Sequence, residues 1–261
     1  MAGESWDAAV ARLIETIGEP AFPQVLRGAL SFHADFDSLV VTEFAAGGRP
    51  NALFHDLDEV RAAIHVAFYE SGPYLLDPFY LACCDGLVAG VYRLLDLAPK
   101  AFFRSEYYRT FYRRVRIKDE LGIVLRNGDT RWIIMSLARG ARRPVFDDHE
   151  LAALSGSFQT ISAAVLRHWS GSADPGTKGL VLPLEQRMTG FAGDALSPRE
   201  AEVLHLVLLG HSTPSAAAQL GIAEGTVKVH RRHAYSKLGI SSQAELFSRV
   251  TRYLAEGGAT G

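Results

Sequence analysis

The sequence predicts an α+β protein with an N-terminal α-β-α layered domain around a central antiparallel sheet and a C-terminal all-α domain of four helices. The chain has 261 residues, more than the ~100–200 typical of one domain. Helical and strand-like patterns mix until residues 170–179, which are rich in Gly and Ser, and only helical patterns follow. We therefore expect a first domain over residues 1–170, a linker over residues 171–195 and a second domain over residues 196–261.

The first domain is expected to place helices around a sheet. In its opening helix, Trp6, Val10 and Leu13 recur at the spacing of one helical face. Similar patterns predict five helices, over residues 5–18, 22–32, 57–70, 106–116 and 146–169. Strand-like runs cover residues 37–46, 86–97, 119–126 and 131–139. The last two runs flank Asn127-Gly128, a strong hairpin signal, so the sheet should be antiparallel.

The second domain repeats the signals that start and end helices. Ser197 is a preferred N-cap residue, and Glu200 stands at the N3 position of the same helix. We expect Thr213 to cap a very short second helix, and a fourth helix to cover residues 241–254. The first three helices should end at Gly210, Gly221 and Gly239. A short helix, a turn containing Gly and a longer helix form a helix-turn-helix unit.

Charge differs between the two predicted domains. The net charge of the whole chain is −2. Residues 196–261 hold seven Lys or Arg residues and five Asp or Glu residues. The first 195 residues hold the other 20 basic and 24 acidic residues. Apolar residues make up 48% and charged residues 21% of the chain, as is ordinary for a globular protein. The basic end therefore indicates a task different from that of the acidic majority.

The third helix of the second domain has one apolar face and one basic face. At ~100° per residue, the buried face should carry Val227, Ala234 and Leu238. Lys228 and Arg232 project from the opposite side, one turn apart, with Val229 beside them. A major groove ~12 Å wide accepts such a helix, and Thr226 at its start can offer a hydroxyl to a phosphate. An ordinary solvated basic face is the alternative interpretation.

Residues 196–253 resemble the LuxR-type helix-turn-helix. The matching segments are Leu196 to Glu200, Gly210, Leu220 to Ile222, Gly225 to His230, and Lys237 to Gly239. The resemblance implies that Lys228, Val229 and Arg232 face DNA bases. It implies backbone contacts for Thr226, Arg231 and Lys237. The sequence departs from the family pattern at Pro214 to Ala216, where a larger apolar residue is usual.

The first domain fits a GAF/PAS-like ligand-binding sensor. A phosphorylation receiver needs an alternation of strands and helices, which the sequence does not show. An ATPase needs a phosphate-binding loop, which the sequence also lacks. Residues 68–82 are similar to the Asp-Pro stretch of autoinducer-binding domains, in which the aspartate binds a ligand amide. Asp77 and Pro78 match that stretch, whereas Phe68 and Ile64 replace the family's Tyr and Trp. The missing Trp disfavours an acyl-homoserine lactone.

Aromatic and acidic side chains of this domain are candidates for lining a ligand pocket. They are Tyr69, Tyr74, Asp77, Tyr80, Tyr92 and Trp132. A carboxylate without a partner among aromatic rings would favour a ligand N–H group or a cation. For each tyrosine, packing in the core with a hydroxyl bonded to the backbone is the more usual alternative. Asp77 could equally serve as a helix N-cap ahead of Pro78.

These observations predict a DNA-binding transcriptional regulator controlled by a small-molecule effector. Its expected partners are double-stranded DNA, the effector and a second copy of the chain, with RNA polymerase an open candidate. Two alternatives stay open: a ligand-independent regulator that acts through protein partners, and an enzyme domain fused to a DNA-binding tail. No HExxH, GxSxG or CxxC motif occurs, so we expect no enzyme, catalytic residues, cofactor or metal.

The sequence also indicates a compartment. Cys83 and Cys84 are adjacent, which cannot make a disulfide framework and is typical of a reducing cytosol. The N-terminal residues lack the pattern of a signal peptide, and no apolar run approaches the ~18–20 residues that span a bilayer. We therefore expect a cytoplasmic protein without a membrane partner.

Overall fold

A computed structural model describes residues 5–45, 49–70, 72–128, 131–170, 191–192 and 195–255. The chain divides into two compact units. The sheet unit comprises residues 1–60, 86–96 and 117–181, and the helical unit comprises residues 61–85, 97–116 and 182–261. Most of the predicted linker, residues 171–190 and 193–194, lies outside the described residues. The predicted domain boundaries therefore stay a prediction.

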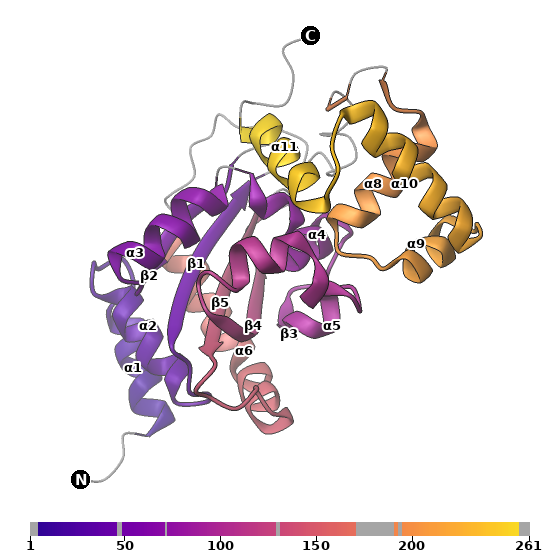
Figure 1. Cartoon of the computed structure of the whole chain (residues 1–261). Coiled ribbons are helices and arrows are strands. Elements are labelled where there is room, and N and C mark those ends of the chain that lie inside the picture. Colours follow the sequence, from indigo (N-terminus) through magenta and orange to yellow (C-terminus); the bar gives the residue numbers. More distant parts are fainter. Residues whose placement is uncertain are drawn as a thin grey trace. The chain divides into compact units, whose positions relative to one another are not determined.

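The sheet unit contains a five-stranded antiparallel sheet, as the fold class α+β predicts (Figure 1). The strand order is β2-β1-β5-β4-β3. The strands are β1 (Ser38–Ala45), β2 (Asn51–His55), β3 (Gly90–Arg93), β4 (Ile117–Arg126) and β5 (Arg131–Gly140). Strands β4 and β5 form the expected hairpin on the two sides of Asn127-Gly128, where Gly128 adopts a φ of +76° that favours glycine.

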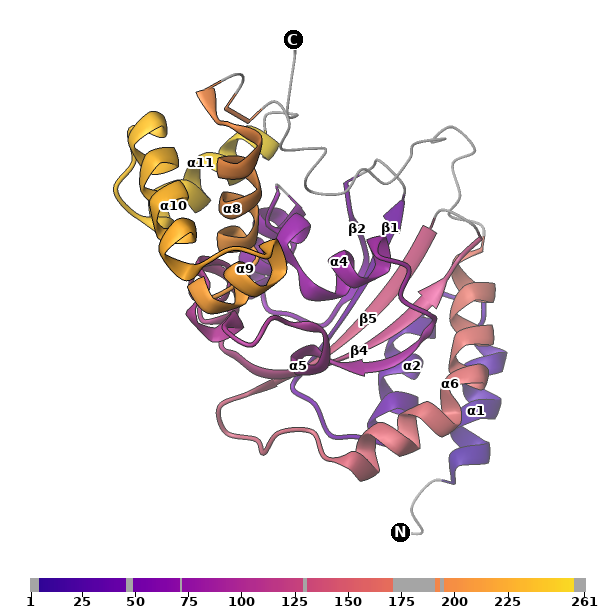
Figure 2. The same cartoon turned by 90° about the vertical axis from the view of Figure 1, so that its right-hand side faces the viewer.

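Three helices cover one face of this sheet: α1 (Trp6–Glu15), α2 (Phe22–Ser31) and α6 (Asp148–Trp169) (Figure 2). The start of α6 is fixed by a capping box, in which Asp147 accepts from the Glu150 N–H at 2.8 Å and Glu150 accepts from the Asp147 N–H at 3.1 Å. Such a box satisfies two N–H groups that have no partner inside the helix. The box therefore defines the residue at which α6 begins.

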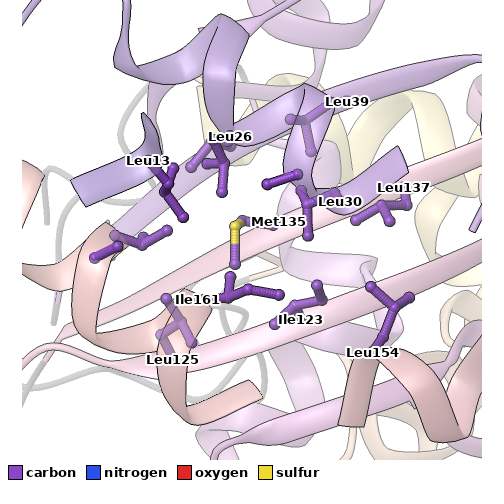
Figure 3. Packing of buried hydrophobic residues seen from close by; sticks show 14 of the residues in the cluster. Leu13, Leu26, Leu30, Leu39, Ile123, Leu125, Met135, Leu137, Leu154 and Ile161 are labelled. Carbon is purple, nitrogen blue, oxygen red and sulfur yellow. The ribbon is translucent and has the colours of Figure 1, made fainter. Parts of the chain in front are cut away.

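The core lies between these helices and the sheet (Figure 3). Leu30 from α2, Met135 from β5 and Ile161 from α6 are among its fully buried side chains. Burying one such side chain stabilises the fold by about 1.5–3 kcal/mol. On β5, Ile133, Met135 and Leu137 belong to this core, so the alternating residues point to the other face of the sheet. This alternation places Trp132 on that other face.

A buried arginine joins β5 to the start of α6. The Arg139 guanidinium donates to both carboxylate oxygens of Glu150, and its Nε donates to the Asp35 carbonyl at 2.7 Å. It also lies 3.8 Å from the ring centre of Phe146. The Arg139 side chain is only 3% exposed. A buried charge is tolerated because these partners replace its water shell.

Two strand predictions need correction. Strand β2 was not predicted, because Asn51–His55 is an edge strand without a clear alternation of apolar and polar residues. The predicted strand over residues 86–97 is shorter: only Gly90–Arg93 forms β3, and Leu94–Leu97 forms the helical turn α5. Periodicity cannot separate a short apolar strand from a short helix.

The helical unit contains only helical elements among its described residues. Its first part continues from α3 (Glu59–Ala62). This part comprises the π-helical segment Ala63–Phe68, the 3₁₀ turn Pro73–Leu76, α4 (Pro78–Cys84), the 3₁₀ turn Phe102–Arg104 and the π-helical segment Tyr108–Tyr112. Its second part comprises α8 (Pro198–Leu208), α9 (Thr213–Leu220), α10 (Glu224–Leu238) and α11 (Gln243–Ala255). No described helix is both long and apolar enough to cross a membrane.

Candidate functional site

The four C-terminal helices are positioned by the caps that the sequence predicts, with one correction. Ser197 and Glu200 form a reciprocal capping box at the start of α8. The N-cap of α9 is Ser212, which accepts from the Ser215 N–H at 3.3 Å, and not Thr213 as predicted. Both hydroxyl residues precede Pro214, so the sequence pattern alone did not separate them. The helix starts one residue earlier than expected.

A tight turn fixes the angle between α9 and α10. Gly221 ends α9 with a φ of +63°, a conformation that costs glycine little. Three residues later α10 begins, and its Val227 and Ala234 are buried as predicted. Val227 packs in one cluster with Val203 of α8 and Ala216 of α9. The predicted third member of the buried face, Leu238, is only half-buried.

The outer face of α10 is open to solvent. Thr226, Lys228 and Arg232 are exposed, and Val229 is an apolar side chain with 41% of its surface exposed. Arg231 is half-buried at the border of the two faces. Neither Lys228 nor Arg232 forms an ion pair with another described residue. Five of the six predicted DNA-contacting residues therefore lie on or beside a face that a duplex can reach.

The sixth, Lys237, has a partner within the protein. Its ammonium group donates to Glu200 at 2.7 Å, and the Ser197 N–H donates to the same carboxylate oxygen at 2.8 Å. The Lys237 ammonium and the Ser197 N–H lower the pKa of Glu200 from 4.5 to about 2. Glu200 is therefore an anion at neutral pH, and Lys237 ties the end of α10 to the start of α8. A phosphate contact for Lys237 stays a prediction.

In the first part of the helical unit, Asp77 serves as the N-cap of α4. Its Oδ1 accepts from the Phe79 N–H at 2.7 Å, which is the cap that the following Pro78 predicts. Its Oδ2 accepts from the hydroxyls of Tyr69 at 3.0 Å and Tyr107 at 3.1 Å. The expectation of a carboxylate without a partner is therefore wrong. Burial nevertheless raises the pKa of Asp77, against the effect of these donors.

Aromatic rings surround this carboxylate. Tyr74 lies between Tyr69 and Tyr80, with ring centres 6.2 and 5.2 Å apart, and all three are buried. Tyr107 stacks on Phe111 at 5.5 Å. Tyr107 was not among the predicted residues, although the spacing of four residues between these two rings in a predicted helix was a signal. Four of the six predicted ligand-binding residues thus lie in one cluster.

The other two, Tyr92 and Trp132, lie on strands of the sheet unit. Tyr92 pairs with Gly122, and its hydroxyl donates to the Val88 carbonyl at 2.8 Å. Trp132 is 6% exposed, and its Nε1–H is buried without a hydrogen-bond partner among the described residues. A buried N–H without an acceptor costs about 1–3 kcal/mol. Among the described residues, no group competes for this donor with the acceptor of a bound molecule.

Within the described ranges, no three His, Cys, Asp or Glu side chains are grouped as metal ligands. Such a group would be needed for a protein-held zinc ion. The structure thus offers no described residues on which a metal site could be proposed.

Comparison with known proteins finds similarity to bacterial regulatory proteins. The family model for bacterial regulatory proteins of the luxR family matches residues 194–250. An Aeromonas salmonicida protein, named as an HTH-type transcriptional regulator in the exeN 3' region, is 36% identical over 186 residues, which cover 68% of this chain and 94% of that protein. Mycobacterium tuberculosis NarL, named as a transcriptional regulatory protein, is 40% identical over 74 residues, 28% of this chain and 34% of NarL.

Among solved structures, a domain from Pseudomonas aeruginosa is similar in fold to about two thirds of this chain. The VqsR LBD domain of Pseudomonas aeruginosa has a TM-score of 0.56 and 23% sequence identity, and the match covers 64% of this chain and 98% of that domain. The likeness agrees with the α+β fold described above.

Proposed function

This chain belongs to the LuxR family of bacterial regulatory proteins, and from that premise we propose a transcriptional regulator whose DNA binding is set by a small molecule held in its N-terminal part. The family membership predicted from the sequence is confirmed, and with it the function of a DNA-binding regulator. The residues that contact DNA and the control by an effector are our proposals.

The exposed basic face of α10 carries the proposal for DNA contact. Lys228 and Arg232 are one helical turn apart and have no ion-pair partner among the described residues, so both can reach base edges or phosphates. Val229 between them can meet the methyl group of a thymine. Thr226 at the start of the helix, together with Arg231 at its border, would bind the sugar-phosphate backbone.

We further propose that the regulator acts as a homodimer in the cytoplasm, where bacterial DNA lies. Two recognition helices related by a two-fold axis read half-sites about one DNA turn apart. Selection of bound duplexes from a randomised pool by the full chain tests this proposal. A two-fold symmetric consensus is the expected result, and recovery of duplexes without any consensus would contradict it. Whether RNA polymerase is also a partner is a separate matter for transcription assays.

Two sets of polar groups support the proposal for an effector. The Nε1–H of Trp132 is a buried donor that has no acceptor among the described residues. A carbonyl or carboxylate of a ligand would supply this acceptor. Asp77 already accepts two tyrosine hydroxyls and a backbone N–H. A ligand N–H that reaches Asp77 would therefore displace the hydroxyl of Tyr69 or Tyr107, which could then donate to the ligand.

Thermal-shift measurements with a library of small amides, amines and aromatic acids test the effector. We expect a compound that stabilises the wild type and binds about 5- to 10-fold more weakly to Trp132→Phe, because one hydrogen bond is worth about 1 kcal/mol. Trp6→Phe is the matched control, since Trp6 lies on α1 and packs against the core on the opposite face of the sheet. A library in which nothing stabilises the wild type would favour the ligand-independent regulator that acts through protein partners. Turnover of a compound would instead favour the enzyme.

A further inference from the structure

An open hollow of about 580 Å³ lies beside the exposed face of α10. Side chains of α10 form one wall, and the segment that leads into α11 forms the other. The lining residues are Lys228, Arg231, Arg232, Tyr235, Ser236, Ile240, Ser241, Ser242 and Gln243. We refer to this feature as the α10 hollow.

The α10 hollow is positively charged. Lys228, Arg231 and Arg232 all line it, and none of the three forms an ion pair with another described residue. The hydroxyls of Ser241 and Ser242 are already taken, because both donate to Glu245, at 2.9 and 3.1 Å. Three cations that have no ion-pair partner among the described residues surround one concave surface, and this arrangement favours the binding of an anion.

Tyr235 adds a neutral donor to this surface. It is half-buried, and no hydrogen bond of its hydroxyl to another described residue is present. Burial and the nearby carboxylate of Glu106 raise the pKa of Tyr235, while the nearby Arg231 lowers it, and the balance keeps the phenol protonated at neutral pH. A protonated phenol donates its O–H to an oxygen acceptor such as a phosphate.

The position of Tyr235 along α10 fits the edge of a major groove. It lies seven residues after Lys228, which is about 10 Å at 1.5 Å per residue. The major groove is ~12 Å wide, and the N-terminal part of a recognition helix is the part that contacts bases. When Lys228 reaches the bases, Tyr235 therefore lies near the strand that borders the groove.

We propose that the α10 hollow binds one phosphate of the DNA backbone at the edge of the major groove, with Arg231 and Tyr235 as its ligands. This inference rests on the proposed docking of α10 and adds Tyr235 to the contacts that the sequence predicts. Arg231 supplies the charge, and the Tyr235 hydroxyl supplies a directed hydrogen bond.

Fluorescence anisotropy with the full chain and a labelled 30-base-pair duplex of mixed sequence tests the proposal, because backbone contacts do not depend on base sequence. Tyr235→Phe removes only the hydroxyl, and we expect binding to weaken by about 10-fold or more for each protomer that contacts the duplex, as for a hydrogen bond to a charged group. The slope of log K against log salt should stay unchanged in this variant. In Arg231→Gln the slope should become shallower by about 0.9 for each phosphate that the protein no longer neutralises.

Tyr253→Phe is the matched control, since Tyr253 lies on α11 and its buried hydroxyl has no partner among the described residues. This control should bind DNA as the wild type does. Equal affinity of Tyr235→Phe and wild type, with Lys228→Ala impaired, would overturn the phosphate site and leave the proposed function intact. A wild type that binds no duplex would overturn both. Stabilisation of the DNA-free wild type by pyrophosphate, without any effect of Tyr235→Phe on the duplex, would also overturn the proposal, in favour of a small phosphorylated ligand.

Discussion

Replacing Lys228 and Arg232 together with alanine is expected to lower the affinity of the full chain for its selected duplex by at least about 100-fold. Each base or phosphate contact contributes about 1–3 kcal/mol, and in a dimer each substitution removes its contact from both protomers. Removal of two cations per protomer should also make the slope of log K against log salt shallower, by about 0.9 for each phosphate that is no longer neutralised. Fluorescence anisotropy over a range of salt concentrations measures both quantities.

The double variant should keep its fold, because both side chains are exposed and lack ion-pair partners among the described residues. An unchanged melting temperature would establish this. Arg252→Ala is the matched control, since it removes one exposed cation from α11, away from the face of α10. Wild-type affinity in the double variant would mean that α10 does not enter the groove.

Local signals made the C-terminal helices predictable. Caps such as Ser197 with Glu200, and the left-handed Gly221 and Gly239, depend on residues within four positions of each other, so a single sequence contains the whole interaction. The wrong prediction of Thr213 in place of Ser212 as the N-cap of α9 has the same origin. Both residues offer a hydroxyl one or two residues before Pro214. Local patterns identify a cap to within one residue.

Partners far apart in the chain were not predictable in the same way. The family resemblance that implies a DNA contact for Lys237 cannot show that Glu200, 37 residues earlier, is its partner. Asp77 was interpreted as a cap and as a ligand group, and only the fold shows that Tyr107, 30 residues later, donates to it. A sequence pattern indicates which residues share a face, whereas the tertiary structure decides which charges and hydroxyls already have partners.

Arg139→Met is expected to lower the free energy of unfolding of the sheet unit by about 3–5 kcal/mol, because removing one partner of a buried ion pair leaves the other charge unpaired. Without Arg139, the Glu150 carboxylate keeps only the Asp147 N–H among the partners described for it, and the junction between β5 and α6 loses its link to Asp35. All three tryptophans of the chain, at positions 6, 132 and 169, belong to the sheet unit. Tryptophan fluorescence during urea unfolding therefore reports on this unit.

Arg143→Met provides the matched control for this decrease in stability. Arg143 forms its ion pairs with Asp35 and Asp37 at 3.3 and 2.6 Å, but about a third of its side chain is exposed. Water already solvates such a pair, so its removal should cost no more than about 1 kcal/mol. The double variant Arg139→Met/Glu150→Met should regain part of the stability, because no unpaired charge stays buried and only the cap of α6 and the link to Asp35 are missing. Equal stability of Arg139→Met and Arg143→Met would show that burial of the Arg139 pair does not hold the junction between the sheet and its long helix.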